Sequence, residues 1–398
     1  MSTFSFSNLA IKAVATAVPA QVHTFDPNSR RAARFSKQMG IEQVHISLTE
    51  QTSLDLGYVA LKDALAHVSW APDELDLLVF NTQSPDLRGG VGNSHLLHKY
   101  LKLKESCAVF DLTVGCAALP YLLSVVGSLA CCASDITKIA ILSGDTKWMQ
   151  YQSPEEIKAS PVQLSGEGTG VMLLERVSAA PPLKIELYAQ GQGYLHLFNL
   201  PSLKNSWQRS EDYVLPDGAH WHVGPLDNRN YMNGMAIHEF VTGKICDQLK
   251  SYFTQVDPAT FNYFAFHQAN GQILSALCTK LGLAPERMLS SLKHYGNTSG
   301  ASVLVTLSAN ADKLNDGAHI FSASYGMGLA WGFIEFTLPP HAVLPVSTTE
   351  LCLTEHQLKP VPPPSAQPTP PAQPAQPAQT APSALAPQPA LSAKAAPL

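Results

Sequence analysis

Cys116, His267 and Asn297 are the residues whose types and settings suit chemistry on an acyl group. Cys116 follows the apolar run 108–112 and the residues Thr-Val-Gly, and apolar residues at helical spacing come after it. The pattern predicts a strand that turns sharply into a helix at the cysteine. The attacking form of cysteine is the thiolate, and a free thiol has a pKa of about 8.5. A helix N-terminus carries partial positive charge and unpaired N–H groups, so it favours that anion. Taken alone, Cys116 fits a small buried hydrophobic residue equally well.

The other two candidates lie in the second half of the chain. His267 ends the short apolar segment Tyr263-Phe-Ala-Phe266, and Asn297 lies in a glycine turn directly before a helical pattern. A single histidine after an apolar strand is more commonly a structural residue. A cysteine nucleophile followed by two hydrogen-bond donors is a more specific combination, because such donors can stabilise the negative charge that develops in acyl chemistry.

Strands alternate with helices along the chain, which predicts an α/β fold with largely parallel sheets. The expected strands and helices of the first half cover residues 9–18, 52–68, 75–80, 93–103, 108–112 and 138–143. The second half repeats this order, with a strand at 263–266, helices at 271–281 and 299–314, and a strand, Gly-x-Gly turn and strand within 319–336. We therefore expect two duplicated halves, residues 1–177 with the nucleophile and residues 178–345 with the histidine and asparagine.

Residues 346–398 have a different composition. Thirteen of the 30 prolines lie from position 360 onward, mixed with Ala, Gln and Ser. A segment with so little apolar periodicity cannot bury enough surface to offset its ordering entropy, so we expect a disordered tail. It could be a docking arm or simply a tolerated terminus.

Composition limits the function classes. The net charge is −5 and no basic run resembles a nucleic-acid footprint, so we expect no nucleic-acid partner. The seven cysteines show no C-x-x-C pair, which favours a reducing compartment and six small buried hydrophobic cysteines besides Cys116. The N-terminus lacks a signal-peptide pattern, and no apolar run reaches the roughly 18 residues that span a bilayer. We expect a cytoplasmic protein without a membrane span.

Four motifs resemble those of β-ketoacyl-ACP synthase III, a family of the thiolase superfamily. They are Phe110-Asp-Leu-Thr-Val-Gly-Cys116, His267-Gln-Ala-Asn270, Tyr295-Gly-Asn297-Thr-Ser299 and Gly326-Met-Gly-Leu-Ala-Trp-Gly332. The resemblance covers roughly residues 9–337. A thiolase would carry a second cysteine near the last motif, and none occurs there. The resemblance implies a thiolase-like five-layer αβαβα fold of two duplicated halves, and a homodimer.

The same resemblance implies roles for the residues. Cys116 would be acylated by acyl-CoA or by an acyl group on acyl carrier protein (ACP), with the oxyanion held by the backbone N–H groups of Cys116, Met327 and Gly328. His267 and Asn297 would donate to a malonyl thioester and stabilise the enolate formed on decarboxylation. No metal and no bound cofactor is expected.

Some positions depart from the family pattern. Arg34 stands where many members have a tryptophan that stacks on coenzyme A, His238 replaces an aromatic lining residue, and Met327 replaces a glycine. We expect Arg34, His238 and Asn270 to contact the substrate or its carrier. The departures suggest a divergent condensing enzyme of fatty-acid-like or secondary-metabolite biosynthesis, such as polyketide biosynthesis, more than a housekeeping fatty-acid initiator. The alternative is an acyltransferase that passes the acyl group from Cys116 to an alcohol, an amine or another non-malonyl nucleophile.

Overall fold

The computed structural model describes residues 2–26, 28–47, 50–87, 90–146, 164–199, 211–214, 218, 220–223 and 230–353. Within them, residues up to 353 belong to one compact unit with two large sheets. The first sheet has the strand order β17-β2-β8-β7-β5-β6 and the second β1-β9-β16-β15-β14. Their strands are β1 (Ser2–Phe6), β2 (Leu9–Pro19), β5 (Leu77–Asn81), β6 (Ala108–Leu112), β7 (Lys138–Asp145), β8 (Gly168–Arg176), β9 (Leu183–Ala189), β14 (Tyr263–Phe264), β15 (Ala318–Gly326), β16 (Ala330–Leu338) and β17 (Ser347–Thr349).

The sheets repeat one another. In the first, β2, β8 and β7 pair antiparallel and β7 pairs with β5 in parallel. In the second, β9, β16 and β15 pair antiparallel and β15 pairs with β14 in parallel. This matching order confirms the expected duplication. The expectation of largely parallel sheets is confirmed for the first sheet, where β17 and β2, β7 and β5, and β5 and β6 pair in parallel. It is wrong for the second sheet, where only β14 and β15 do, because a short connection such as the turn from β15 to β16 forces neighbouring strands antiparallel.

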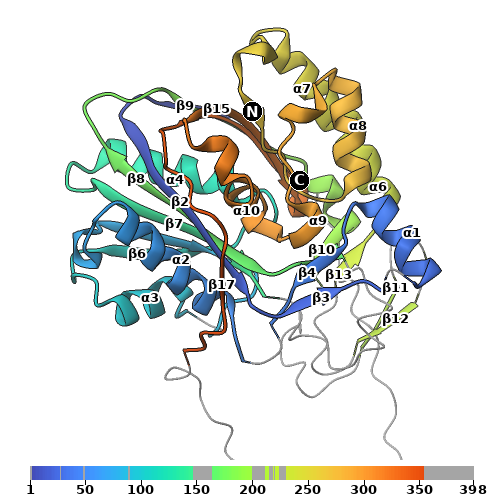
Figure 1. The fold of residues 1–398 in the computed structure, drawn as a ribbon, viewed down its shortest axis with the longest axis horizontal. Coiled ribbons are helices and arrows are strands. Elements are labelled where there is room, and N and C mark those ends of the chain that lie inside the picture. The colour runs from blue at the N-terminus through green and yellow to red at the C-terminus, as the bar shows by residue number, and fades with distance from the viewer. Residues whose placement is uncertain are drawn as a thin grey trace, which may run out of the picture. The chain divides into compact units, whose positions relative to one another are not determined.

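Helices and sheets alternate in five layers (Figure 1). Helices α2 (Ser53–His67) and α3 (Asn93–Leu101) pack on the outer face of the first sheet, where an apolar core joins them to it. Helices α4 (Ala118–Cys132) and α10 (Ser302–Ser308) lie in the core between the two sheets. Helices α7 (Cys246–Phe253) and α8 (Gly271–Leu281) cover the outer face of the second sheet. The expected αβαβα architecture is confirmed.

Smaller elements lie outside the two large sheets and the helices that cover them. They are β3 (Val22–Thr24), α1 (Arg30–Met39), β4 (Gln43–His45), β10 (Leu197–Asn199), β11 (Glu211–Val214), β12 (His220–Val223), β13 (Asn230–Met232), α6 (Gly234–Glu239) and α9 (Leu292–Tyr295). A π-helical segment, residues 240–245, joins α6 to α7.

Two expectations differ in detail from the structure. Strand β6 is only partly buried, although its sequence is apolar, because it is the edge strand of its sheet. The helix expected over 299–314 is broken into a 3-10 turn at Ser299–Ala301, helix α10 and a second 3-10 turn at Ala311–Leu314. Ser299 has a φ of +53°, which an α-helix does not accommodate.

The expected tail, residues 346–398, is described only to Leu353, and residues from 354 onward lie outside the described part of the chain. Strand β17 pairs with β2, Ser347 lying opposite Ala17. The side chain of Gln51 donates to the carbonyl oxygens of Thr349 and Leu351, at 3.0 and 2.8 Å. The start of this segment, residues 347–353, is therefore a strap that adds an edge strand to the first sheet, and the expectation of a disordered tail is wrong for these residues.

Candidate active site

Cys116 lies in the short loop between β6 and α4, as the sequence predicts. A buried side chain of β5 fixes this loop, because the backbone N–H of Val114 donates to Oδ1 of the fully buried Asn81 at 2.8 Å. The first turn of α4 holds no acidic residue, and its N-cap residue, Ala117, makes no side-chain cap. The positive end of the α4 dipole therefore faces the half-buried thiol without a competing carboxylate.

Gly326, at the end of β15, packs directly against Cys116. A Cβ atom added to Gly326 would lie 2.8 Å from Cβ of Cys116 and 3.1 Å from its backbone nitrogen. The φ of Gly326 is 176°, an extended value that any residue can adopt. Glycine is thus needed here for space, and the turn that begins with it is in contact with the nucleophile loop.

His267 follows β14 and is 97% buried, with 3% of its surface exposed. The backbone N–H of His267 donates to the carbonyl oxygen of Ala323 at 2.8 Å. The backbone carbonyl oxygen of His267 accepts a hydrogen bond from the hydroxyl of Tyr325 at 3.2 Å. The Tyr325 ring stands edge-on to the imidazole, with centroids 5.3 Å apart. Burial first, and then negative charge on Cys116, raise the pKa of Tyr325 far above its usual range. Tyr325 therefore stays a neutral phenol beside the histidine.

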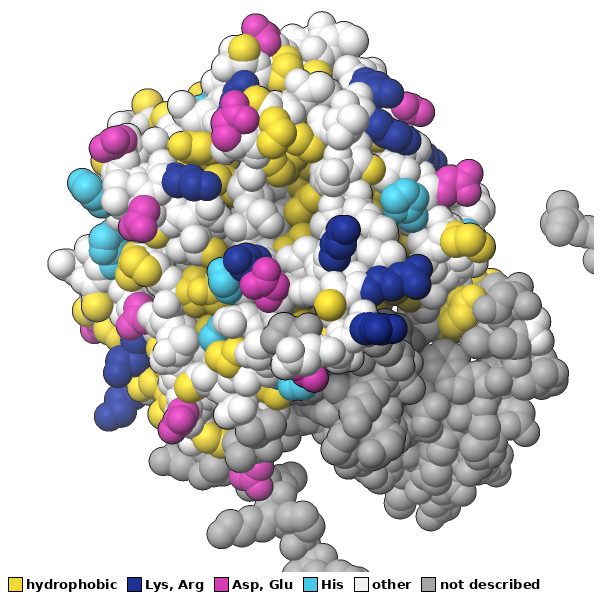
Figure 2. All heavy atoms as spheres, turned by 45° about the vertical axis from the view of Figure 1, so that its right-hand side comes forward, with side chains coloured by type: hydrophobic (Ala, Val, Ile, Leu, Met, Phe, Trp, Pro, Cys, Tyr) yellow, Lys and Arg dark blue, Asp and Glu magenta, His cyan; other side chains and the backbone are white. Residues whose placement is uncertain are grey.

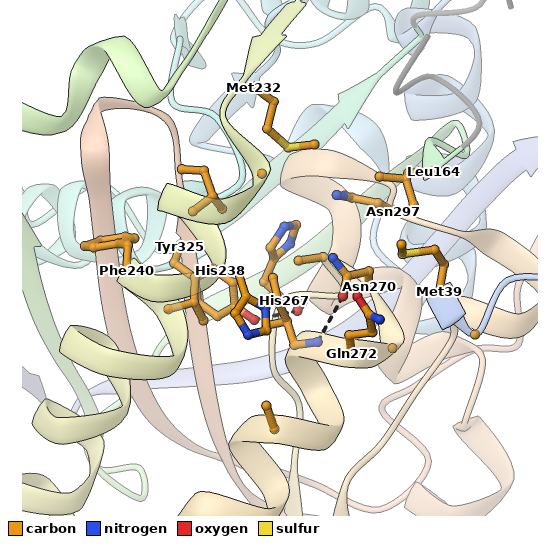
Figure 3. A pocket seen from close by; sticks show the side chains of 18 of the residues that line it. Met39, Leu164, Met232, His238, Phe240, His267, Asn270, Gln272, Asn297 and Tyr325 are labelled. Carbon is orange, nitrogen blue, oxygen red and sulfur yellow. Dashed lines mark hydrogen bonds between the residues drawn. The ribbon is translucent and has the colours of Figure 1, made fainter. Parts of the chain in front are cut away.

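Asn297 is fixed by both its backbone and its side chain. Its N–H donates to Leu164 at 2.8 Å and its carbonyl accepts the N–H of Gly166 at 3.2 Å. Its side-chain oxygen accepts the N–H of Ser299 at 2.9 Å. Because the oxygen is used in this way, the amide nitrogen is the end that points into the cavity, as Figure 3 shows.

One cavity of about 1900 Å³ joins these side chains. Seven of the eight expected site residues line it: Arg34, Cys116, His238, His267, Asn270, Asn297 and Met327. The eighth, Gly328, is not among the described lining residues, although it belongs to the turn that touches Cys116. Much of the remaining wall is apolar and includes Leu164, Met232 and Phe240 (Figure 3).

Residues expected to contact substrate differ in their settings. Asn270 caps α8, since its Oδ1 accepts the N–H of Ile273 at 2.9 Å. His238 of α6 and Arg34 of α1 are both exposed at the cavity. Lys37 of α1 and Lys280 of α8 also line it, and Figure 2 shows Lys and Arg side chains gathered on the side of the surface that carries α1. The rim can therefore attract an anionic carrier.

Sequence reasoning missed two residues of the site, Ser299 and Tyr325. Ser299 is buried and its Oγ lies 3.8 Å from Sγ of Cys116. Both residues belong to motifs that already drew attention, one two positions after Asn297 and the other directly before Gly326. Their positions next to known candidates were the available signal.

The remaining cysteines divide into three buried ones, two exposed ones and Cys352, which is only partly buried. Burial raises the pKa of Cys107 to about 11 and also raises the pKa of Cys246 and Cys278. These three are inert thiols of the expected kind. Cys131 and Cys132 are exposed, so the expectation that they are buried is wrong. They lie in the last turn of α4, which reaches the surface.

Among the described residues, no group of three or more His, Cys, Asp and Glu side chains could hold a metal ion. In the same part of the chain, every helix is too short or too polar to cross a bilayer.

Comparisons with known proteins show which proteins this chain is similar to. Residues 253–337 match a family model described as the C-terminal part of 3-oxoacyl-[acyl-carrier-protein] synthase III. The chain is 27% identical over 307 residues to a β-ketoacyl-[acyl-carrier-protein] synthase III of Porphyra purpurea, covering 75% of this chain and 88% of the relative. It is 28% identical over 333 residues to that of Gloeobacter violaceus, covering 81% and 95%.

Solved structures confirm the fold. A 3-oxoacyl-(acyl-carrier protein) synthase of Burkholderia xenovorans superposes with a TM-score of 0.76 at 21% identity, covering 87% of this chain and 99% of that one. A 3-oxoacyl-(acyl carrier protein) synthase III of Pseudomonas aeruginosa gives a TM-score of 0.70 at 23% identity, covering 83% and 98%. The expected thiolase-like architecture is thereby confirmed.

Proposed function

We propose that this chain, a divergent relative of the β-ketoacyl-ACP synthases III, is a condensing enzyme that carries an acyl group on Cys116. The observation that supports it best is the cavity itself. It brings Cys116 from the first half of the chain together with His267 and Asn297 from the second half, although about 150 residues or more separate them in sequence. A nucleophile at a helix N-terminus and two fixed donors form the set that acyl transfer followed by enolate formation requires.

The first proposed step is self-acylation. The Cys116 thiolate attacks the carbonyl carbon of an acyl thioester, and the backbone N–H groups of Cys116, Met327 and Gly328 stabilise the oxyanion. The new bond joins the carbonyl carbon to Sγ of Cys116, and the bond to the carrier sulfur breaks. The carrier leaves as a thiolate and takes up one proton, equal to the one that Cys116 lost when its thiol ionised. Coenzyme A or ACP can be that carrier.

The second proposed step is decarboxylative condensation. A malonyl thioester places its thioester oxygen between the imidazole of His267 and the amide nitrogen of Asn297. Carbon dioxide leaves as the bond to the carboxylate breaks, and the two donors stabilise the enolate. The enolate carbon then attacks the acyl carbon, the bond to Sγ breaks, and a β-ketoacyl thioester leaves with Cys116 regenerated.

The test separates the two steps. Purified protein is treated with acyl-CoA or acyl-ACP and the Cys116 peptide is analysed by mass spectrometry, after which malonyl-ACP is added and carbon dioxide is measured. We expect the adduct on Cys116, followed by its loss with release of one carbon dioxide per acyl group. Acylation without carbon dioxide release, with transfer to an added alcohol or amine instead, would favour the acyltransferase alternative.

Two variants refine this test. In the proposed mechanism His267 and Asn297 act after acylation, so His267→Ala and Asn297→Ala should spare acylation and slow condensation by about 10²–10³. An equal loss of both steps would contradict the division of roles and favour His267 as a general base.

We also propose a homodimer and a cytoplasmic role in fatty-acid-like or polyketide biosynthesis, with residues 1–177 and 178–345 as the two repeated halves. The partly buried apolar edge strand β6 supports the dimer, because an edge strand can pair with a second copy. Light scattering of a variant with a charge on this strand, Val109→Lys, is expected to show the monomer. An unchanged dimer would place the interface elsewhere.

A further inference from the structure

Ser299 connects two of the proposed catalytic groups. Its hydroxyl oxygen lies 3.8 Å from Sγ of Cys116, and its backbone N–H donates to the side-chain oxygen of Asn297 at 2.9 Å. The residue is buried, with 2% of its surface exposed. The hydroxyl and the backbone N–H of Ser299 are thus both directed at the site and not at solvent.

The backbone around Ser299 is held in a conformation that a serine seldom adopts. Its φ of +53° lies in the left-handed region, which is uncommon for residues other than glycine. The next residue, Gly300, is pressed against the first sheet, since a Cβ atom there would lie 2.5 Å from Oγ of Ser143 and 3.0 Å from Nδ2 of Asn81. Asn81 is the side chain that holds the Cys116 loop through Val114. Asn81 therefore lies against the residue that follows Ser299 and also binds the nucleophile loop.

We propose that Ser299 is a further catalytic residue, whose hydroxyl donates a hydrogen bond to the Cys116 thiolate while its N–H fixes the amide of Asn297. The inference rests on the proposed function only in taking Cys116 as the nucleophile. A donor to the ionised form of a group favours that form, and catalytic hydrogen bonds are often long before substrate binds. The separation of 3.8 Å is a contact that can shorten once the sulfur carries charge.

Other titratable groups of the cavity have to stay constant in the test. Tyr325 of β15 interacts electrostatically with Cys116, since negative charge on Cys116 contributes to raising the pKa of Tyr325. His267 lines the same cavity. The charged or titratable side chains farther along the wall come from α1, α6 and α8 and are Arg34, Lys37, His238 and Lys280. None of these is changed in the variants below.

The experiment measures how fast iodoacetamide alkylates Cys116 between pH 5 and 10 in the full chain. The Cys116 peptide is followed by mass spectrometry, so that the exposed Cys131 and Cys132 do not contribute. Ser299→Ala and Ser299→Gly both remove the hydroxyl. Glycine accepts a positive φ without strain, so Ser299→Gly keeps the backbone as it is. Ser324→Ala is the control, because its buried hydroxyl makes no hydrogen bond in the described part of the structure.

We expect the pH midpoint of alkylation to rise by about one unit in both Ser299 variants, a tenfold slower reaction at pH 7, and to stay unchanged in Ser324→Ala. Unchanged midpoints in the Ser299 variants would overturn the proposal. A shift in Ser299→Ala but not in Ser299→Gly would also overturn it, since strain would then be the cause. If no acyl thioester labels Cys116 but the midpoints still shift, the proposed function fails and the role of Ser299 stands.

Discussion

Replacing Gly326 by alanine tests whether its packing against Cys116 sets the position of the nucleophile. The added carbon would lie 2.8 Å from Cβ of Cys116, whereas carbon atoms rest at about 3.5 Å or more, so the two must separate by roughly 0.7 Å. Overpacking of this kind costs about 1–3 kcal/mol of unfolding free energy. A displacement approaching 1 Å can cost about 10²-fold in rate. We expect Gly326→Ala to slow acylation of Cys116 by about 10- to 100-fold.

The assay is single-turnover acylation of the Cys116 peptide, with unfolding measured in denaturant. Gly191→Ala is the matched control, because a Cβ atom at this exposed glycine meets no heavy atom within 4 Å and its φ is not in the left-handed region. The control should react and unfold like the wild type. A Gly326→Ala protein with the wild-type acylation rate would refute the reasoning, since the nucleophile would then tolerate displacement of the turn.

Three further predictions concern the strap, one buried carboxylate and the rim. A chain ending after Val346 loses β17 and the bonds to it and should unfold with about 2–4 kcal/mol less free energy, whereas a chain ending after Leu353 should match full length in thermal melts. Burial is the main cause that raises the pKa of Asp55 from 3.8 to about 6, so the folded state takes up a proton at higher pH than the unfolded state does. This contribution to stability is fully present only below the unfolded pKa of 3.8 and is lost as the pH rises through 6, so the wild type should gain about 2 kcal/mol over Asp55→Asn between pH 7 and pH 4. Denaturant titrations at several pH values measure it, and a constant difference would contradict it. We expect acyl-ACP to acylate Cys116 faster than acyl-CoA, and Arg34→Ala to slow the ACP reaction about 2- to 10-fold at low salt only. A preference for acyl-CoA that is independent of salt would rule this out.

The local parts of the site could be predicted from sequence because they depend on neighbouring residues. The apolar run of β6, the glycine before Cys116 and the apolar spacing of α4 all lie within about 25 residues, and each matches the structure. His267 and Asn297 follow the same rule, since a short strand or turn presents each of them. That they share one cavity came from the resemblance, which supplied the distant pairing that periodicity does not contain.

Other parts depend on long-range contacts and had no such signal. Strand β1 joins the second sheet through β9, and β17 joins the first through β2. The sequence Ser347-Thr-Thr349 carries no hydrophobic alternation that indicates a strand. Its pairing is decided by Gln51 and Asp55, about 300 positions earlier, whose side chains bind the backbone of residues 349–353. A helical pattern over 299–314 was likewise overridden by the close approach of Gly300 to the first sheet.

Two strand pairings that join the halves of the chain explain how a site shared by both halves keeps its geometry. Strand β1 belongs to the first half of the chain but pairs in the second sheet, and β17 follows the second half but pairs in the first. Each sheet therefore includes a strand from the other end of the chain, and separating the sheets would break both pairings. The distance from Cys116 to His267 and Asn297 is set by this interface, not within either half. It follows that a change that loosens the strap, far from the cavity, should slow acylation as well as condensation, because the turn at Gly326 that adjoins Cys116 belongs to the second half, as His267 and Asn297 do.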